Sequence, residues 1–210
     1  MDPTFWHNKW SADQIAFHEG QANAHLVAQL PVLDLAPDSR LLLPLCGKTR
    51  DIGWLLSRGH RVVGVELSPL AIDQLFRDLA LTPTITSRGR MQHYSAERID
   101  ILVGDIFDAT PEMVGTVDAV YDRAALVALP PDLRPRYADH IRTLSHAAQQ
   151  LLICFEYDQN STNGPPFSVT ADEVATLYAG SHIITKLARS PVDGGLRGTT
   201  PAHEVVWHLA

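Results

Sequence analysis

An acidic residue at the end of one apolar run and a single glycine after another are the first candidates for chemistry in this sequence. Glu66 lies near the end of residues 61–67, and Gly47 follows residues 40–45. In a nucleotide-binding α/β unit, a carboxylate at the end of the second strand accepts hydrogen bonds from ribose hydroxyls. The alternative for Glu66 is a surface carboxylate near the start of a helix. Its position at a strand end favours ligand binding.

The turn around Gly47 excludes two phosphate-binding motifs. A P-loop requires G-x-x-x-x-G-K-[ST], and Leu42 stands where its first glycine would be. A dinucleotide site requires G-x-G-x-x-G so that the backbone can approach a pyrophosphate, and only one glycine is present here. S-Adenosylmethionine has a ribose and an adenine but no phosphate, so it tolerates this turn. An NAD-linked oxidoreductase stays open as an alternative, because Glu66 suits both cofactors.

Two charged residues follow later predicted strands. Asp105 is placed either to lie against an adenine edge or to cap the segment at Phe107. Arg123 can bind the carboxylate of a cofactor or polarise a substrate through charge-assisted hydrogen bonds. The alternative for Arg123 is an internal ion pair with Asp122 or Asp118. Both residues are therefore candidates for the same crevice.

Trp6 and Trp10 lie four residues apart, on one face of a predicted helix. A contact with the apolar core is the more common explanation for such a pair. A sulfonium cation, however, gains about 0.5 to 2 kcal/mol from an aromatic wall. The N-terminal aromatic residues therefore suit a roof over a sulfonium cofactor as well as a core contact.

The histidines and cysteines show no metal-binding pattern. None of the ten histidines has the spacing of a motif such as H-E-x-x-H. Cys46 and Cys154 are too far apart in the chain to suggest a metal pair or a disulfide framework. We expect no metal site and a reducing cytoplasmic location. Close packing under the Gly47 turn best explains Cys46.

The elements that must position these residues alternate between apolar runs and helical patterns. Helical patterns follow the first two runs, and a Ser68-Pro69 pair is placed to start the second of them. This alternation is typical of a parallel sheet covered on both faces. The connection between the last two runs is too short for a crossover helix, so we expect an antiparallel hairpin there. The predicted strands are residues 40–45, 61–67, 99–103, 117–121, 150–155, 183–187 and 205–209.

Two segments fall outside this alternation within a single predicted domain, residues 1–210. Residues 1–35 carry the aromatic helix, and residues 82–98 are a polar insertion. Ligands of doubly wound sheets lie beyond the carboxyl ends of the strands. We therefore expect residues 1–35 to form a lid and residues 82–98 to lie near the active site.

The composition is that of a soluble globular enzyme. Of the 210 residues, 45% are hydrophobic and 20% charged, and the formal net charge is −7. A nucleic-acid surface would need clustered positive charge, so nucleic acid is excluded as a partner. No run is long and apolar enough to span a membrane, and the N-terminus does not resemble a signal peptide.

Several stretches together resemble the thiopurine S-methyltransferase family, especially its bacterial members. They run in order from FWHNKW and FHEG through LLLPLCGKTRDIGWL, GHRVVGVELS, GDIF and VDAVYDRAALVAL to GPPF. The resemblance implies an α/β fold of the class I S-adenosylmethionine-dependent methyltransferases. This is a Rossmann-like, seven-stranded, mostly parallel sheet with a C-terminal antiparallel hairpin. It also implies a monomer that transfers a methyl group from S-adenosylmethionine to sulfur.

Family positions carried across by motif give the expected site. Arg123 is the candidate catalytic residue, and Phe17 would lie over the substrate as part of the lid. Arg197, in GGLRG, is a further candidate for substrate contact. Family members often have Asp-Arg-Gly where this chain has Asp-Arg-Ala, and Ala124 would narrow the pocket. The expected cofactor contacts are Trp10, Leu45, Glu66, Asp105, Ile106 and Arg123.

The expected chemistry needs alignment more than acid–base catalysis. Positioning of donor and nucleophile can account for about 7 to 11 kcal/mol of barrier lowering. The expected acceptors are thiopurines and related aromatic or heterocyclic thiols, with selenium and tellurium compounds as further candidates in detoxification. A non-catalytic S-adenosylmethionine-binding protein stays open as an alternative, because the reaction requires no proton-transfer group.

Overall fold

The computed structural model describes residues 3–15 and 18–210. Within these ranges, nine strands form one mixed sheet in the order β3-β4-β5-β2-β1-β6-β7-β9-β8. The strands are β1 (Arg40–Pro44), β2 (Arg61–Glu66), β3 (Thr84–Arg88), β4 (Met91–Ala96), β5 (Ile99–Val103), β6 (Ala119–Arg123), β7 (Gln150–Glu156), β8 (Ile184–Pro191) and β9 (His203–Leu209). The α-helices are α1 (Pro3–Ser11), α2 (Ala24–Gln29), α3 (Arg50–Ser57), α4 (Pro69–Asp78), α5 (Pro111–Val114), α6 (Arg134–Ser145) and α7 (Ala171–Tyr178). Short 3-10 turns are η1 (Leu30–Leu33), η2 (Ile106–Asp108), η3 (Leu126–Ala128) and η4 (Gln159–Ser161).

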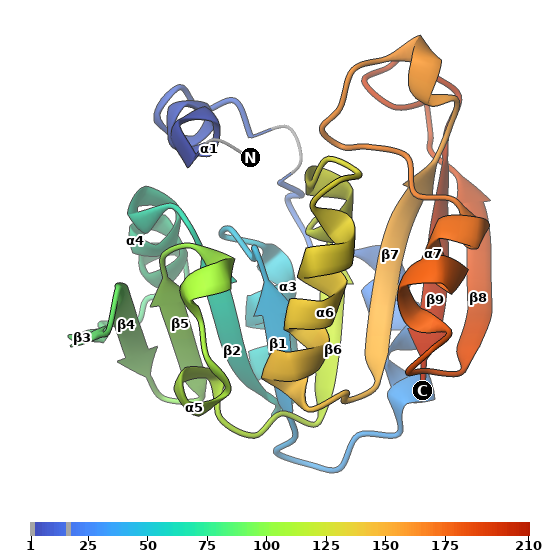
Figure 1. Cartoon of the computed structure of the whole chain (residues 1–210). Helices are drawn as coiled ribbons and strands as arrows, with labels where there is room; N and C mark the ends of the chain where they lie inside the picture. The colour runs from blue at the N-terminus through green and yellow to red at the C-terminus, as the bar shows by residue number, and fades with distance from the viewer. Residues whose placement is uncertain (1–2, 16–17) are drawn as a thin grey trace.

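The central strands β5, β2, β1, β6 and β7 run parallel. Their carboxyl ends meet at one edge of the sheet, which we call the crest, at the top of Figure 1. The chain continues from β1 to β2 on one side, and β6 lies on the other side of β1. Strand order therefore reverses between β1 and β6, and ligands of open α/β sheets bind outside the carboxyl ends at such a point.

Helices cover both faces of the sheet, so the strands of its centre are apolar on both sides. Leu41 and Leu43 pack on the face covered by α2, α3 and α4, whereas Leu42 packs on the face covered by α6 and α7. All three leucines are buried. This double burial explains why β1 is a continuous apolar run and does not alternate with polar residues.

All seven predicted strands are present, with shifts of a few residues at their ends. β6 lies two residues later than predicted, at Ala119–Arg123. β8 and β9 pair antiparallel, as the short connection between them predicted. The predicted helix start is also confirmed, because the Ser68 hydroxyl accepts a hydrogen bond from the Ala71 N–H and Pro69 opens α4. The class I methyltransferase fold is thus the observed fold.

The prediction of seven strands was two too few. The segment interpreted as a polar insertion, residues 82–98, forms the antiparallel hairpin β3–β4, which extends the sheet beyond β5. β3 is exposed along its whole length, so it lacks the apolar run that marked the other strands. Gln92 lies opposite Val103, which places the hairpin turn level with the carboxyl end of β5.

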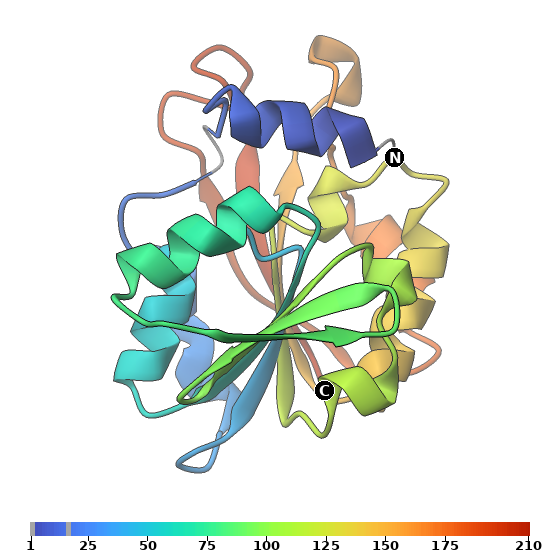
Figure 2. The same ribbon diagram turned by 90° about the vertical axis from the view of Figure 1, so that its left-hand side faces the viewer.

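Helix α1 crosses above the crest, as the second view shows most clearly (Figure 2). It lies beside α4 at one end of the sheet. The loops that contain residues 157–168 and 192–202 rise on the other side of the crest (Figure 1). The N-terminal helix and these two loops therefore surround the edge of the sheet where a ligand is expected.

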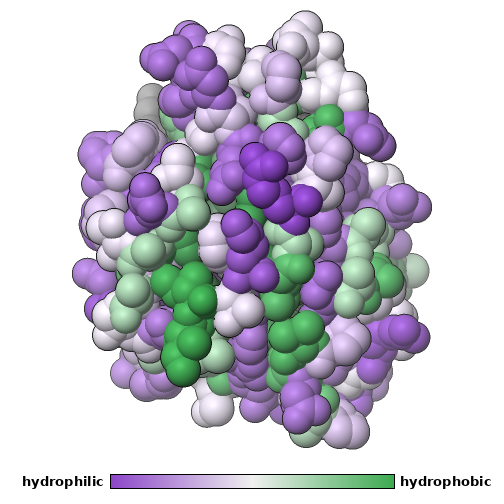
Figure 3. Space-filling view, turned by 90° about the vertical axis from the view of Figure 1, so that its right-hand side faces the viewer, coloured by the Kyte–Doolittle hydropathy of each residue, from purple (hydrophilic) through white to green (hydrophobic). Residues whose placement is uncertain are grey.

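The face over the edge strand β8 carries several separate hydrophobic patches with hydrophilic residues between them (Figure 3). Ile183, directly before β8, is 75% exposed. Separate apolar patches on a surface are normal for a globular protein and need no partner to explain them.

Candidate functional site

The turn after β1 has an unusual backbone that brings Trp10 close to the sheet. Leu45 and Gly47 have φ values of 47° and 52°, in the left-handed region. A Cβ atom added to Gly47 would lie 3.0 Å from the Trp10 ring, so glycine permits this close approach. A left-handed leucine costs roughly 1 to 2 kcal/mol. Such strain often occurs at functional turns, and here it stands where the cofactor was predicted.

Glu66 ends β2 with its carboxylate held by the backbone of two neighbouring turns. Its Oε2 accepts a hydrogen bond from the Gly47 N–H at 2.8 Å, and its Oε1 accepts one from the Ser68 N–H at 2.8 Å. Burial raises the pKa of Glu66, and hydrogen bonds from Ser68, Gly47 and Leu67 oppose that rise. A carboxylate offers about four acceptor positions. Glu66 therefore keeps acceptor capacity for a ribose hydroxyl while being fixed in place.

Cys46 packs beneath this turn, as predicted. A Cβ atom added to Gly64 of β2 would lie 2.7 Å from the Cys46 Sγ, so the glycine makes room for the thiol. Burial, followed by the charge of Glu66, raises the pKa of the Cys46 thiol well above its usual value. The side chain is thus a packed thiol and not a nucleophile.

Arg123, at the carboxyl end of β6, pairs with Glu19 of the N-terminal segment. The alternative prediction of a pair with Asp122 or Asp118 was wrong. Asp122 lies on the opposite face of the strand, where its Oδ2 accepts a hydrogen bond from the Tyr137 hydroxyl at 2.7 Å. Asp118 accepts a hydrogen bond from the backbone of β1. The guanidinium of Arg123 therefore stands at the crest with a partner from the predicted lid.

The turn after Arg123 is held by Asp122. The Asp122 Oδ1 accepts a hydrogen bond from the Leu126 N–H at 3.1 Å, and the carboxylate also accepts one from the Ala125 N–H. Ala124, between Arg123 and Ala125, has a φ of 62°, in the left-handed region. Burial raises the pKa of Asp122 to about 6, and these hydrogen bonds oppose the rise. A buried carboxylate with neutral donors thus fixes the backbone next to Arg123.

Asp105 and Ile106 follow β5 at the crest. The Asp105 Oδ1 accepts a hydrogen bond from the Phe107 N–H at 3.0 Å, which is the capping role named as the alternative. Ile106 is buried, and its carbonyl lies 2.8 Å from the His140 Nε2. The Gly104 N–H donates to the Glu66 carbonyl at 2.9 Å, so this loop is joined to the end of β2. Contact with an adenine stays a prediction for both residues.

Arg197 is the predicted substrate residue that lies within the described part of the chain. Arg197 donates to the Thr162 hydroxyl at 3.3 Å and to the Pro165 carbonyl at 2.8 Å, so it joins the two loops beside the crest. Phe17 lies outside the described residues. Trp10 is buried, with 5% of its surface exposed, and Phe5 packs edge-on against Trp6. The structure thus brings Trp10, Leu45 and Glu66 together.

Sequence reasoning missed Glu19, Asn23, Asp51 and Tyr121 as parts of this region. Glu19 and Asn23 follow the crossing helix, and the carboxylate of Glu19 accepts from the Asn23 side chain at 3.3 and 3.4 Å. Glu19 stands in FHEG, one of the stretches that carried the family resemblance. Glu19 could therefore have been identified from the sequence, as a charged residue within a stretch that matches the family.

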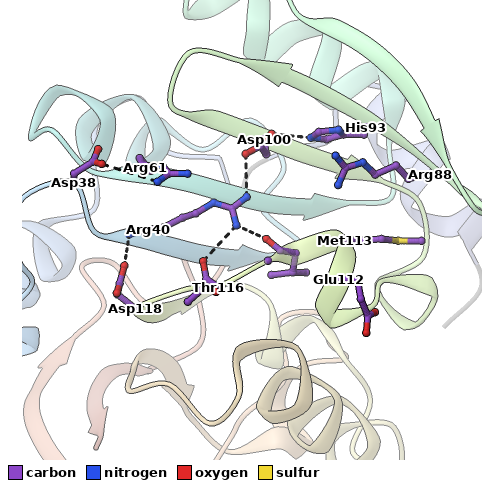
Figure 4. A pocket seen from close by; sticks show the side chains of 12 residues that line it. Asp38, Arg40, Arg61, Arg88, His93, Asp100, Glu112, Met113, Thr116 and Asp118 are labelled. Carbon is purple, nitrogen blue, oxygen red and sulfur yellow. Dashed lines mark hydrogen bonds and ion pairs between the residues drawn. The ribbon is translucent and has the colours of Figure 1, made fainter.

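A cavity of about 500 Å³ lies far from these residues, at the amino end of the sheet. Arg40 occupies its centre and donates to Asp100 at 2.9 Å and to the Val114 carbonyl (Figure 4). His93 lies 2.7 Å from Asp100, and Asp118 accepts from the Arg40 backbone. These groups bond to one another, although the buried Arg40 Nε has no hydrogen-bond partner among the described residues, so this amino-end cavity has the character of a structural ion-pair network.

In the part of the chain that the structure describes, no group of histidine, cysteine or acidic side chains is arranged to hold a metal ion. In the same residues, no helix has the length and apolar composition needed to cross a membrane.

The residues at the crest fit S-adenosylmethionine. Glu66 offers acceptor capacity at the end of β2, and the glycine turn admits the Trp10 ring without a phosphate-binding nest. With the strand order, these features define a class I S-adenosylmethionine-dependent methyltransferase. A solved structure agrees with this fold: 1,6-didemethyltoxoflavin-N1-methyltransferase from Burkholderia thailandensis, with bound S-adenosylhomocysteine. It matches with a TM-score of 0.65 at 18% identity, over 99% of this chain and 85% of its own.

The family model for thiopurine S-methyltransferase matches residues 1–203. The thiopurine S-methyltransferase of Xanthobacter autotrophicus is 52% identical over 210 residues, which are 100% of this chain and 99% of the relative. That of Gluconobacter oxydans is 43% identical over 206 residues, or 98% of this chain and 94% of the relative. The chain belongs to the thiopurine S-methyltransferase family, as its motifs predicted. It is by this membership an S-adenosylmethionine-dependent methyltransferase and not an NAD-linked oxidoreductase.

Proposed function

We propose that the protein transfers a methyl group from S-adenosylmethionine to the sulfur of thiopurines and related aromatic or heterocyclic thiols. The observation that carries this proposal is the match of residues 1–203 to the thiopurine S-methyltransferase family. The high identity to full-length relatives supports the same reaction class.

Three residues of the crest are proposed to bind the cofactor from the strand side. Glu66 accepts a hydrogen bond from a ribose hydroxyl, because its carboxylate is already fixed by the Gly47 and Ser68 N–H groups. Leu45 and Trp10 form apolar walls at the same turn. The aromatic face of Trp10 also favours a nearby cation.

The loop after β5 is proposed to flank the adenine. Asp105 is fixed by its bond to the Phe107 N–H, and Ile106 presents a buried apolar side chain beside it. Neither residue needs a charge for this role. The loop supplies shape and backbone polarity.

Arg123 is proposed to stabilise an anion at the crest, either the substrate thiolate or the cofactor carboxylate. S-Adenosylmethionine, when bound, supplies a methyl group on a positively charged sulfur. An aromatic thiol ionises readily and needs no strong base in the protein. The chain therefore contributes mainly alignment, which can lower a barrier by about 7 to 11 kcal/mol.

Residues 1–35 are proposed to act as a lid, with Phe17 and Arg197 at the substrate. The position of α1 above the crest supports this role for the N-terminal segment (Figure 2). Arg197 supports it by joining the loops beside the crest. Residues 82–98, as the β3–β4 hairpin, would border the site from the edge of the sheet.

We also propose that the protein is a cytoplasmic monomer. Both cysteines are free and buried, which suits a reducing compartment. Selenium and tellurium compounds are further proposed acceptors, because the site needs to align a soft nucleophile and not to deprotonate one.

Incubation of the purified protein with labelled S-adenosylmethionine and 6-mercaptopurine tests the function. Labelled S-methyl product is expected. Calorimetry with S-adenosylhomocysteine distinguishes an enzyme from the remaining alternative. Binding without product formation would indicate a non-catalytic S-adenosylmethionine-binding protein. Absence of both binding and product would contradict the proposal.

A further inference from the structure

Five polar residues from three parts of the chain are linked by hydrogen bonds at the crest, and strand β6 closes them into a ring. We call it the polar ring. In it, Arg123 donates to Glu19, and Glu19 accepts from the Asn23 side chain. The Asn23 N–H donates to the Asp51 Oδ1 at 2.7 Å, and the Tyr121 hydroxyl donates to the Asp51 Oδ2 at 3.0 Å. Tyr121 and Arg123 are two apart on β6 and share one face of the strand, which closes the ring.

The ring is buried where it meets the fold. Asp51 and Tyr121 are 1% and 2% exposed, and Asn23 is 4% exposed. Burial, followed by the charge of Asp51, raises the pKa of Tyr121 well above its usual value, so the hydroxyl remains a donor. Asp51 lies in the first turn of α3, where a carboxylate is favoured by the helix dipole. The buried part of the ring, formed by Asn23, Asp51 and Tyr121, is therefore the anchor that holds it in the fold.

The ring extends from this anchor to the guanidinium of Arg123. An arginine side chain is long, and fixing it costs conformational entropy on ligand binding unless it is already ordered. Glu204 offers a competing partner: burial raises the pKa of its carboxyl, and His25 and Arg123 lie close enough for their charges to oppose that rise. Asn23 holds the carboxylate of Glu19 in place, which directs Arg123 to Glu19.

Two further groups in the neighbourhood, Glu204 and His25, are already engaged. Glu204 pairs with His25 at 3.4 Å, and His25 also lies 3.1 Å from the Ser190 hydroxyl. The Asn23 Oδ1 caps α2 through the His25 and Leu26 N–H groups. The segment that holds Glu19 is thus fixed to α2 through Asn23.

We propose that the polar ring holds Arg123 in its working orientation and joins it to the lid segment, with Glu19, Asn23, Asp51 and Tyr121 as positioning residues. This inference rests on the proposed role of Arg123 in methyl transfer. A ring that merely stabilised the fold would lower activity only in proportion to the loss of folded protein. A positioning ring acts through Arg123 and therefore has no effect once Arg123 is absent.

The test compares kcat/KM for 6-mercaptopurine in Tyr121→Phe and in Tyr94→Phe. Tyr94 is a buried tyrosine on the same face of the sheet that hydrogen-bonds to Asp73, outside the ring. We expect Tyr121→Phe to lower kcat/KM about tenfold, as for the loss of one buried hydrogen bond. Tyr94→Phe should leave it within about twofold at a comparable fall in Tm. Equal losses of activity in both variants would overturn the inference.

The second arm repeats Tyr121→Phe in an Arg123→Ala background, with labelled donor to measure the residual activity. A positioning ring predicts less than about a twofold further loss there, since coupled residues are not additive. A further loss of the full tenfold would overturn the inference and leave the role of Arg123 standing. Wild-type activity of Arg123→Ala alone would instead overturn the proposed role of Arg123, and the inference with it.

Glu19→Gln provides a variant without risk to folding, because the side chain of Glu19 is 39% exposed. It keeps the shape of the residue and removes its charge. We expect Glu19→Gln and Tyr121→Phe to lower kcat/KM through the same path. The double variant should therefore lose little more activity than either single variant. Independent, multiplicative losses would contradict a shared path through Arg123.

Discussion

The two ends of the parallel sheet both hold buried charges, but they use them differently. At the amino end, Arg40 donates to Asp100 and to two surrounding carbonyls beside a cavity of about 500 Å³. At the crest, Glu66 is fixed by backbone N–H groups and keeps acceptor capacity, and Arg123 pairs with a residue of the lid segment. The amino-end cavity is therefore structural. Fixed polar groups that can still accept or donate a hydrogen bond therefore indicate a reaction site better than cavity volume does.

Left-handed backbone is found at both ends of the sheet. Leu45 and Ala124 both have left-handed φ values, and both directly follow a strand at the crest. At the amino end, Asp38 and Arg98 lie before β1 and β5 with φ values of 66° and 64°. Strained residues concentrate at functional sites, but a left-handed φ alone does not distinguish the two ends.

The largest expected effect lies at the amino end. Arg40→Met removes the cation that bridges Asp100 and the Val114 carbonyl, so we expect the free energy of unfolding to fall by about 3 kcal/mol. Affinity for S-adenosylhomocysteine should stay the same. Urea unfolding and calorimetry measure the two quantities. Arg61→Met is the control, because its pair with Asp38 is exposed and should contribute at most about 1 kcal/mol.

Removal of the Glu66 carboxylate at the crest should instead lower cofactor affinity and leave the free energy of unfolding nearly the same. Glu66→Ala loses hydrogen bonds to a charged acceptor, and we expect S-adenosylhomocysteine to bind more weakly by roughly 1.5 to 3 kcal/mol. Glu112→Ala, at the rim of the amino-end cavity, should leave this affinity unchanged. An unchanged dissociation constant for Glu66→Ala would remove the functional contrast between the two ends.

Acidification should stabilise the crest through Asp122. Its pKa is raised from 3.8 to about 6 in the folded protein, so the folded state takes up a proton more readily than the unfolded chain. The group's contribution is therefore present in full below pH 4 and is lost as the pH rises through 6. We expect a gain of about 1 kcal/mol between pH 7 and pH 5 from this group. Urea unfolding at both pH values should show a smaller gain in Asp122→Asn, and equal gains would contradict the assignment.

The smallest effect tests the strain next to Arg123. Ala124→Gly suits the left-handed φ of 62° and should raise the free energy of unfolding by about 0.5 to 1 kcal/mol. It should also widen the pocket if Ala124 narrows it, which kcat/KM for a bulkier thiol would detect. Ala125→Gly is the matched control, since that alanine has a negative φ of −95° and should lose stability. Destabilisation by Ala124→Gly would show that the turn is not strained.

The sequence predicted the buried part of the fold well, because burial on both faces leaves continuous apolar runs. The strands β1, β2, β5, β6 and β7 of the parallel core follow from such runs, whereas the hairpin β3–β4 was missed. β3 could not be found in this way, since an edge strand that is exposed throughout has the composition of a loop.

The sequence predicted candidate residues that stand at strand ends. It did not predict which side chains bond to one another. Glu66 and Arg123 were identified because strand ends of a parallel sheet meet at one edge. The partner of Arg123 lies 104 residues away, in a segment without a regular pattern. The adjacent Asp122, named as one alternative partner, lies on the opposite face of the strand because of the pleat.

The two buried cysteines have a consequence for a protein that handles a reactive methyl donor. Burial raises the pKa of both Cys46 and Cys154 well above the usual value, so neither sulfur is a thiolate at neutral pH. Neither cysteine thus presents a thiolate to the alkylating group of the methyl donor. Self-methylation is suppressed by packing, and the native protein should likewise resist iodoacetamide until it unfolds.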